Sequence, residues 1–434
     1  MHVFRSAVRC SLRRTGFGGV SRWASAFILL LGLIVSSGAP AAGQAAFPGA
    51  PDEPTVNLRI YPFDFWSPRV GLGAGAGLVF HHLGRSNAQA LLTFAPARYE
   101  QVATGVWASA NPHRARQYVL VNTRALHTNR DWFYGLGPGS ALDARQSIER
   151  SAAQVRVRVR QAFLDHRLIV QPHLGVSTHR IDRVPNPTAS SLSRPSRTHL
   201  RQLASTTLGP LSPRQSGLRV GVAVLYDSRS RPSRSMGGVL LQGRWSRYLD
   251  LTSSFVRFDQ FDLAAYGFLP LGGPHHLAGR LHLTLTSPRG RATVPYYLRP
   301  TLGGSRVPGW ARSRFVASDR FLTSVLYRFP LFQILSVVDF GGHVGVHAAS
   351  VYDAFFSEAR AELTFEESLS SGRASVPLRP SASAGLHVGL SFRETPSLDF
   401  ALGVSPEGVT AVRFTFSQNL RALRPPHHRM LRSY

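Results

Sequence analysis

The feature that most constrains this chain is an alternation of apolar and polar side chains with a period of two residues. Residues 155–160 read Val-Arg-Val-Arg-Val-Arg, and the same period is present in 281–285, 384–393 and 412–417. Successive side chains of a β-strand point to opposite faces, so each segment has one apolar face and one polar or cationic face. Soluble β-sandwiches alternate too, with the apolar face inward. Long alternating strands repeated without a helical pattern are typical of a transmembrane barrel, whose apolar face meets lipid and whose polar face lines the lumen.

This alternation, together with the turn residues between segments, predicts sixteen strands. They are expected near 55–62, 69–81, 87–96, 101–110, 117–127, 152–164, 167–180, 217–227, 237–248, 253–263, 277–287, 320–329, 336–347, 382–393, 396–404 and 410–420. Four connections stand out as long, namely 128–151, 181–216, 288–319 and 348–381. Short turns that alternate with long loops are the pattern of outer-membrane barrels, with the turns in the periplasm. The sequence therefore predicts an all-β fold, a sixteen-stranded antiparallel transmembrane β-barrel of the outer membrane.

The first 41 residues have the three parts of a secretory signal peptide. Residues 1–23 carry five Arg and no acidic residue, residues 24–35 are an apolar run, and Ala39-Pro40-Ala41 matches an A-x-A cleavage site. This apolar run is too short for a membrane-spanning helix, which needs about 20 residues. We expect cleavage after Ala41 and export from the cytoplasm. The only cysteine, Cys10, leaves with this segment, which excludes a disulfide framework and a Cys-based metal site in the mature chain.

The chain after the signal peptide (1–41) is expected to be one domain with short flanks. Residues 42–53 are a short periplasmic segment, residues 54–420 are the barrel, and residues 421–434 are a C-terminal tail. Pro425 and Pro426 in this tail forbid continuation of a β-ladder, because proline has no backbone N–H to donate.

The positive charge of the chain comes from arginine alone. All 50 basic residues are Arg, against 23 acidic residues, and the net charge is +27, or +22 without the signal peptide. A cationic surface can bind nucleic acid through its phosphates. These arginines, however, occupy alternate strand positions, and no nucleic-acid-binding motif accompanies them. We expect them to line the lumen or to contact lipid phosphates at the rim.

Two alternatives stay open for the lumen. Unpaired arginines would give an open pore a preference for anions, whereas a plugged lumen would let them pair with Asp and Glu. The basic residues that we assign to the lumen-facing side are Arg156, Arg158, Arg160 and Arg280.

The sequence predicts no catalytic, metal or cofactor site. Histidines occur in pairs at 81–82, 275–276 and 427–428, but adjacent strand residues point to opposite faces, so a pair supplies at most one inward ligand. A nucleophile elbow of the G-x-S-x-G type is not found. Glu366 and Glu367 lie in a long loop and are interpreted as solvated charge. We therefore expect that the chain is not an enzyme.

Several motifs in the second half of the chain occur in the order found in one known family. They are Tyr-Asp-Ser-Arg at 226–229 with Met-Gly-Gly at 236–238, Leu-Gly-Gly-Ser with Val-Pro-Gly-Trp at 302–310, the strand 326–331, Val-Val-Asp-Phe-Gly at 337–341, and the closing hairpin 392–401. On these residues the chain resembles the C-terminal barrel of the BamA/TamA-type outer-membrane assembly factors, also called the bacterial surface antigen family. The resemblance implies a barrel that inserts or translocates polypeptides, or lipids, through a labile seam between its first and last strands.

Two features depart from the family pattern. Family members carry periplasmic POTRA domains before the barrel, whereas residues 42–57 are too few for one, so we expect a barrel without POTRA domains. The arginine of the family's sixth external loop falls on Pro308, with Arg306 and Arg312 beside it. In the family, that arginine pairs with a lumenal carboxylate and holds the loop inside the barrel.

The corresponding lock in this chain is expected to join the sixth loop to Asp339. In the strand 336–347 the lipid-facing set is Phe340, Gly342, Val344 and Val346, so Asp339 points into the lumen, where an unpaired carboxylate is costly. Arg306 or Arg312 is the expected partner; the alternative is that Asp339 pairs with an arginine of a neighbouring strand and the loop is free. The residues assigned to the lock are Gly303, Gly304, Arg306, Gly309, Trp310, Arg312 and Asp339.

Two functions from different classes remain. The first is insertion or translocation of protein or lipid, with outer-membrane lipids and, as the resemblance implies, outer-membrane protein clients or periplasmic partner proteins as partners. The second is a passive anion-preferring pore or structural barrel that has lost the assembly role. Both place the chain in the cell outer membrane, and neither requires a nucleic-acid partner.

Overall fold

The structure is a computed structural model. It describes residues 57–67, 71–83, 86–95, 100–110, 117–140, 142, 145–164, 167–183, 214–229, 237–252, 256–273, 275–289, 294–334, 338–356, 378–390 and 396–416. The predicted signal peptide (1–41), the segment 42–53 and the tail 421–434 lie outside these residues.

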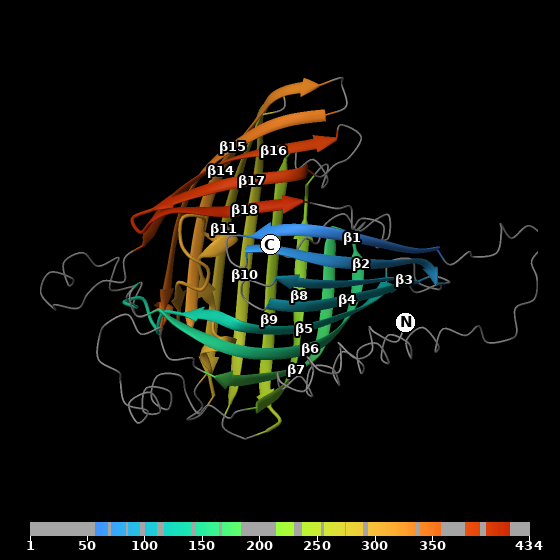
Figure 1. Cartoon of the computed structure of the whole chain (residues 1–434), viewed down its shortest axis with the longest axis vertical. Coiled ribbons are helices and arrows are strands. Elements are labelled where there is room, and N and C mark those ends of the chain that lie inside the picture. Colours follow the sequence, from blue (N-terminus) through green and yellow to red (C-terminus); the bar gives the residue numbers. More distant parts are fainter. Residues whose placement is uncertain are drawn as a thin grey trace, which may run out of the picture.

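Sixteen strands form one antiparallel sheet in which each strand pairs with its neighbours in the chain (Figure 1). Their bounds are β1 Asn57–Ser67, β2 Gly71–Leu83, β3 Ser86–Ala95, β4 Glu100–Ala110, β5 Gln117–Phe133, β6 Gln146–Phe163, β7 Leu168–Arg183, β8 Arg214–Asp227, β9 Gly238–Asp250, β10 Arg257–Gly272, β11 His275–Pro288, β14 Asp319–Ile334, β15 Val338–Tyr352, β16 Arg379–Leu390, β17 Pro396–Ser405 and β18 Gly408–Phe416. A separate ladder of two short strands, β12 (Thr301–Leu302) and β13 (Phe315–Val316), lies in the connection between β11 and β14. No helix in the described ranges has the length and hydropathy needed to cross a membrane.

The outer face of the sheet is apolar and its inner face is polar. On β6, Val155 and Val157 are 38% and 37% exposed, whereas Arg160 is 3% exposed. On β15, Val346 is exposed and His347 is buried. A soluble protein would bury such valines, so this distribution is the one expected of a barrel with lipid outside.

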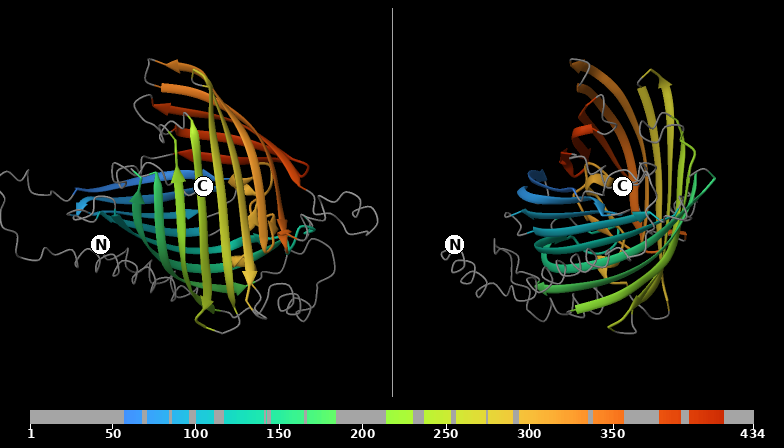
Figure 2. Two further views of the ribbon diagram at one scale, coloured as in Figure 1. Left: turned by 180° about the vertical axis from the view of Figure 1, so that it is seen from behind. Right: turned by 90° about the vertical axis from the view of Figure 1, so that its right-hand side faces the viewer.

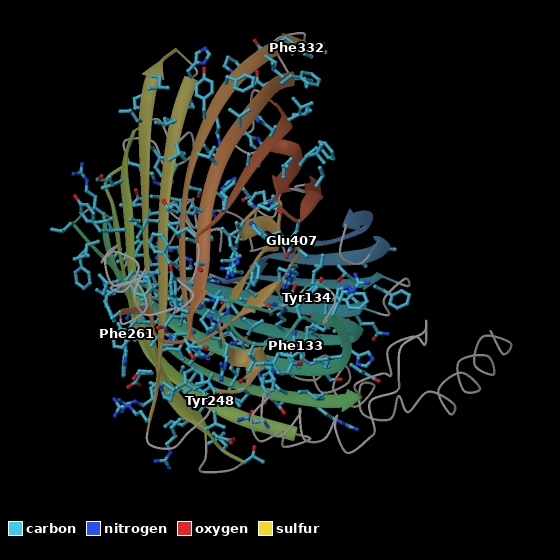
Figure 3. The ribbon with its side chains drawn as sticks, turned by 90° about the vertical axis from the view of Figure 1, so that its left-hand side faces the viewer. Phe133, Tyr134, Tyr248, Phe261, Phe332 and Glu407 are labelled. Carbon is cyan, nitrogen blue, oxygen red and sulfur yellow. The ribbon has the colours of Figure 1, made fainter. Side chains whose placement is uncertain are left out.

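Side chains of the two faces are seen directly in Figure 3. Phe261 of β10 projects from the outside of the wall, whereas Phe133 and Tyr134 lie on its inside. Phe261 is 45% exposed, and the two inner rings are buried. The buried apolar side chains therefore lie inside the curled sheet, where they cover part of its inner face.

The four longest connections between strands of the large sheet all lie at one end of it. Those that follow β5, β7, β11 and β15 span 134–145, 184–213, 289–318 and 353–378. The turns at the opposite end include 164–167 between β6 and β7 and 273–274 between β10 and β11. In bacterial barrels the short turns face the periplasm and the long loops face outward. We therefore take the long-loop end as the external end.

The sheet curls strongly, but its two edges are not joined by a ladder. Figures 1 and 2 show β1–β7 running across the direction of β8–β11, with β1 next to β18. The two edge strands come into contact, yet within the described residues no register pairs one with the other. Each edge therefore presents backbone N–H and C=O groups that the described sheet does not pair.

The predicted fold class is confirmed, and each of the sixteen predicted segments overlaps one strand of the large sheet. Several strands are longer than predicted: β6 begins at Gln146 instead of 152, and β10 ends at Gly272 instead of 263. The alternation is weak at Ala152 and Ala264, because alanine contrasts little with its neighbours. The ladder continues there because backbone hydrogen bonds do not depend on side-chain polarity. The strands β12 and β13 are too short to show a period.

Candidate functional site

We define residues 289–318, between β11 and β14, as loop six; its described residues 294–318 fold back against the inner face of the sheet. It contains two short helical turns, η2 (Tyr296–Leu298) and η3 (Gly304–Arg306). One buried cluster joins the loop to the inner faces of β14 and β15; its members are Leu302, Val307, Trp310, Phe315, Ala317, Leu322, Ala349 and Val351. Loop six is therefore an interior element, packed on the wall of the barrel.

Two of the predicted loop glycines allow a close approach of backbone to backbone. At Gly309 φ is +93°, and a Cβ there would lie 2.6 Å from the carbonyl oxygen of Val404 on β17. The Gly309 carbonyl also accepts a hydrogen bond from Ser405 Oγ at 2.7 Å. At Gly303 φ is +111°, and a Cβ would overlap the carbonyl of Ala311. Because any larger residue would be strained and would clash, these positions require glycine.

A buried arginine ties loop six to the last hairpin. Arg314 Nε lies 2.8 Å from both carboxylate oxygens of Glu407, in the turn between β17 and β18, and its Nη2 lies 2.6 Å from Oε1. Its Nη1 donates to Ser140 Oγ at 3.1 Å. The guanidinium lies 4.4 Å from the ring centre of Phe315 and 5.1 Å from that of Tyr134. Figure 3 shows Tyr134 and Glu407 on the inner side of the sheet. This network fixes the position of the loop relative to the carboxyl-terminal strands.

The first part of loop six contacts the opposite side of the interior. The ring of Tyr296 packs 4.8 Å from that of Phe133 at the end of β5. The hydroxyl of Tyr297 donates a hydrogen bond to Gln215 Oε1 on β8. Burial raises the pKa of both tyrosines well above the usual value, so they are neutral hydrogen-bond donors at physiological pH. Loop six thus reaches from β5 and β8 to β17.

Arginines dominate the inner face beside loop six. Their side chains have the inward phase of β6, β8, β9, β11 and β14, opposite to exposed apolar residues; they are Arg156, Arg158, Arg160, Arg219, Arg244, Arg280 and Arg320. The acid among them is Asp262, whose Oδ2 accepts from Arg244 Nη2 at 2.9 Å and whose Oδ1 accepts from Thr284 Oγ1 at 2.9 Å. Among the described residues of this part of the wall, one carboxylate faces these guanidiniums, which leaves it strongly cationic.

Two wall arginines also hold the backbone of loop six. Arg280 Nη2 donates to the carbonyl of Arg306 at 2.6 Å. Arg320, which is 3% exposed, donates from Nη1 to the carbonyl of Thr301 at 2.9 Å. The cationic wall and the loop are therefore one structural unit.

The structure does not bring together the residues of the predicted lock. Arg306 and Arg312 lie in loop six with exposed side chains. Asp339 is exposed and lies near the short-turn end of β15, opposite Gln333 of β14. Across the part of the chain that the structure describes, no ion pair joins Asp339 to either arginine.

The pair formed by Arg314 and Glu407 takes the place of the predicted lock. Asp339 cannot reach loop six because it lies 13 residues from Tyr352, the external end of β15, and a strand rises about 3.4 Å per residue. The sequence contained two signals of the actual pair, an arginine in the same loop and an acid in the closing turn. Nothing local indicated that they meet.

Potential metal ligands do not converge in the described ranges, where no group of three or more His, Cys, Asp or Glu side chains gathers. Of the predicted histidine pairs, His275 Nδ1 makes a 2.8 Å hydrogen bond with the hydroxyl of Tyr327. The pair 427–428 lies outside the described residues.

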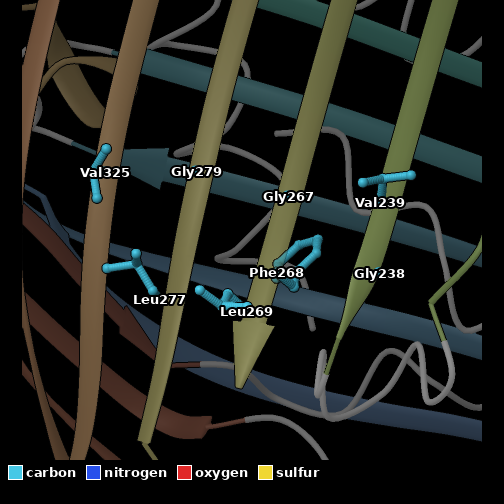
Figure 4. A pocket seen from close by; sticks show the side chains of 8 residues that line it. All are labelled: Gly238, Val239, Gly267, Phe268, Leu269, Leu277, Gly279 and Val325. Carbon is cyan, nitrogen blue, oxygen red and sulfur yellow. The ribbon is translucent and has the colours of Figure 1, made fainter. Parts of the chain in front are cut away.

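Two shallow apolar hollows lie on the outer face of β9–β11 and β14, and Figure 4 shows the one lined by Gly238 and Phe268. They form where Gly267 and Gly279 leave space between the larger side chains Val239, Leu269 and Val325. A binding site for a polar molecule needs convergent polar groups. These hollows are lined almost entirely by apolar groups, so they belong to the apolar outer surface.

Comparison with solved structures identifies the fold. BamA from Haemophilus ducreyi lacking POTRA domains 1–3 has a TM-score of 0.56 and 13% identity, over 84% of this chain and 69% of that chain. CdiB from Escherichia coli has a TM-score of 0.53 and 11% identity, over 85% of this chain and 62% of that chain, so this chain spans less than two thirds of CdiB. No protein-family model and no curated protein matches the sequence. The chain has a sixteen-stranded barrel fold like those of BamA and CdiB.

Proposed function

We propose that this protein is an outer-membrane barrel that inserts or translocates polypeptide segments, or lipids, at the seam between β1 and β18. The apolar outer face and the polar inner face support a position in a bilayer. The likeness of fold to BamA and CdiB supports an insertion or secretion role.

The observation that carries this proposal is the pair of sheet edges without a ladder between them. A free strand edge is a template on which an extended segment of another chain can add as a further strand. In a bilayer, unpaired backbone groups are costly, so an open seam favours any process that pairs them. An incoming strand would pair the backbone N–H and C=O groups at the edge of β1 or β18.

Loop six supports the same role because it holds the strand pair that borders the seam. Its contacts to the last hairpin are the ion pair of Arg314 with Glu407 and the hydrogen bond from Ser405 to Gly309. Release of these contacts would free β17 and β18 to move relative to β1. The loop would then act as a brace that sets how readily the seam opens.

Depletion of the protein, followed by an inventory of outer-membrane proteins and lipids, tests the role. The depleted cells are complemented with chains that carry one cysteine in 57–67 and one in 408–416, which crosslink the seam on oxidation. The mature chain is expected to lack cysteine, so no other disulfide competes. We expect other barrels to be lost on depletion, restored by the reduced variant and not by the oxidised one. An unchanged inventory after depletion would contradict the proposal.

A passive anion-preferring pore is the second candidate, and the cationic inner wall favours it. Fixed positive charge along a lumen raises the local concentration of anions. The two functions differ in the inventory experiment, because loss of a passive pore leaves the other barrels in place.

A further inference from the structure

The outer face of β9–β11 carries a group of charged side chains at its external end, which the proposed function does not use. Asp259 of β10 accepts from Arg247 Nε of β9 at 2.8 Å and from Arg289 Nε, just after β11, at 2.6 Å. All three have the outward phase of their strands, in line with exposed apolar residues such as Leu263. We call Arg247, Arg257, Asp259 and Arg289 the rim cluster.

The strand register fixes the height of the rim cluster above the apolar band. Phe261 pairs with Trp245 on one side and with Leu285 on the other, which makes one apolar and aromatic row across three strands. The next outward row toward the external end contains Asp259, paired with Arg247 and with Ser287. Aromatic rows mark the boundary between hydrocarbon and headgroups in outer-membrane barrels. The rim cluster therefore lies at headgroup depth in the external leaflet.

The charges of the rim cluster do not cancel. The Asp259 side chain is only 8% exposed and is shared by two guanidiniums, whose side chains are 34% exposed in Arg247 and 55% exposed in Arg289. Arg257, exposed on the same face, adds a third positive charge, and the Arg289 N–H donates to its carbonyl at 2.9 Å. Three guanidiniums and one carboxylate leave a net charge of +2 facing the lipid headgroups.

The geometry of the guanidiniums leaves donors for another anion. Arg247 and Arg289 both face Asp259 through Nε and Nη2, so the Nη1 edge of each is directed away from that carboxylate. Planar guanidinium edges bind phosphate oxygens with two parallel hydrogen bonds. Arg247 also lies 5.5 Å from the ring centre of Trp245, which positions it over the apolar band.

We propose that the rim cluster binds the phosphate of a phosphorylated glycolipid in the external leaflet, with the acyl chains lying along the apolar outer face of β9–β11. A free phosphate ion would satisfy the guanidiniums, but it would not use the apolar row directly beneath them. A lipid uses both. This site holds lipid at the barrel wall five to seven strands away from β18 and the seam, and it is independent of any insertion activity.

Native mass spectrometry of the full barrel in detergent micelles tests the site. The probes are lipid A, which carries two phosphates, its fully dephosphorylated derivative, and inorganic phosphate. We expect lipid A to bind the wild-type protein at least tenfold more tightly than the dephosphorylated lipid. An arginine near a membrane surface contributes roughly a fivefold gain in affinity for anionic lipid, so Arg247→Gln with Arg289→Gln should weaken lipid A binding roughly 25-fold.

Two further variants separate the site from general charge and from folding. Arg257→Gln leaves the contacts of Asp259 intact and should weaken lipid A binding roughly fivefold. The control, Arg167→Gln with Arg328→Gln, removes two charges near the short-turn end and should not change binding. Equal binding of both lipids to the wild type overturns the proposal, as does full retention of lipid A by the double variant. Displacement of lipid A by millimolar inorganic phosphate would assign the site to a free anion instead.

Discussion

Arg314 shows how a single residue can connect distant parts of the barrel. It is 3% exposed, and its guanidinium meets the carboxylate of Glu407, 93 residues later in the chain. Removal of one partner would leave the other charge partly buried and unpaired, which is more costly than the pair itself is stabilising. Asp339, by contrast, lies exposed near the other end of β15 and has no part in this network.

We predict that Arg314→Gln and Glu407→Gln each lower the free energy of unfolding of the reconstituted barrel in urea by about 1 to 3 kcal/mol. The double variant should lose little more than either single one, because each change already breaks the same pair. Asp339→Asn is the matched control and should stay within about 0.5 kcal/mol of wild type. Additive losses in the double variant would show that Arg314 and Glu407 do not act as a pair. A large effect of Asp339→Asn would show that Asp339, as the sequence predicts, helps to hold loop six.

Loop six is the element that packs against the inner wall on several sides. Its apolar residues pack on β14 and β15, its tyrosines reach β5 and β8, and its glycines meet β17. The wall arginines Arg280 and Arg320 bind its backbone carbonyls. The loop thus occupies the interior next to a cationic wall that would otherwise face water.

Replacement of residues 296–316 by a Gly-Ser linker should therefore produce a steady current in planar bilayers, larger than that of the wild type. The current should prefer anions, because the wall arginines raise the local anion concentration. In this background, Arg156→Glu with Arg158→Glu should shift the preference toward cations. The control Arg247→Gln changes charge on the outer face and should leave selectivity unchanged. A cation-selective current in the arginine-bearing protein would show that these side chains do not line the path.

At the scale of the whole molecule, stability rests on the long antiparallel ladder from β1 to β18. Fifteen strand pairs are hydrogen-bonded along their length. In detergent or lipid, a broken ladder exposes backbone groups with no water to receive them, so the strands separate together and slowly. The seam between β1 and β18 is the place where this ladder is absent from the described residues.

The protein should therefore fractionate with the outer membrane and be heat-modifiable on a detergent gel. The unboiled sample should run faster than the boiled sample, because the compact barrel persists in detergent until it is heated. Boiling of the same sample supplies the control. Recovery as a soluble periplasmic protein without such a shift would refute the membrane barrel.

The sequence by itself determined the strands and their faces. The phase that puts Val155 outside and Arg156 inside depends only on the geometry of an extended backbone, which is local. Only the tertiary structure decided which charged groups meet. The alternation of side chains gives the face of the sheet on which a residue lies, but not its position along the barrel axis. That position depends on strand register, strand length and the path of each loop. Arg314 therefore meets Glu407 instead of Asp339, and Arg247, Asp259 and Arg289 converge from three chain segments.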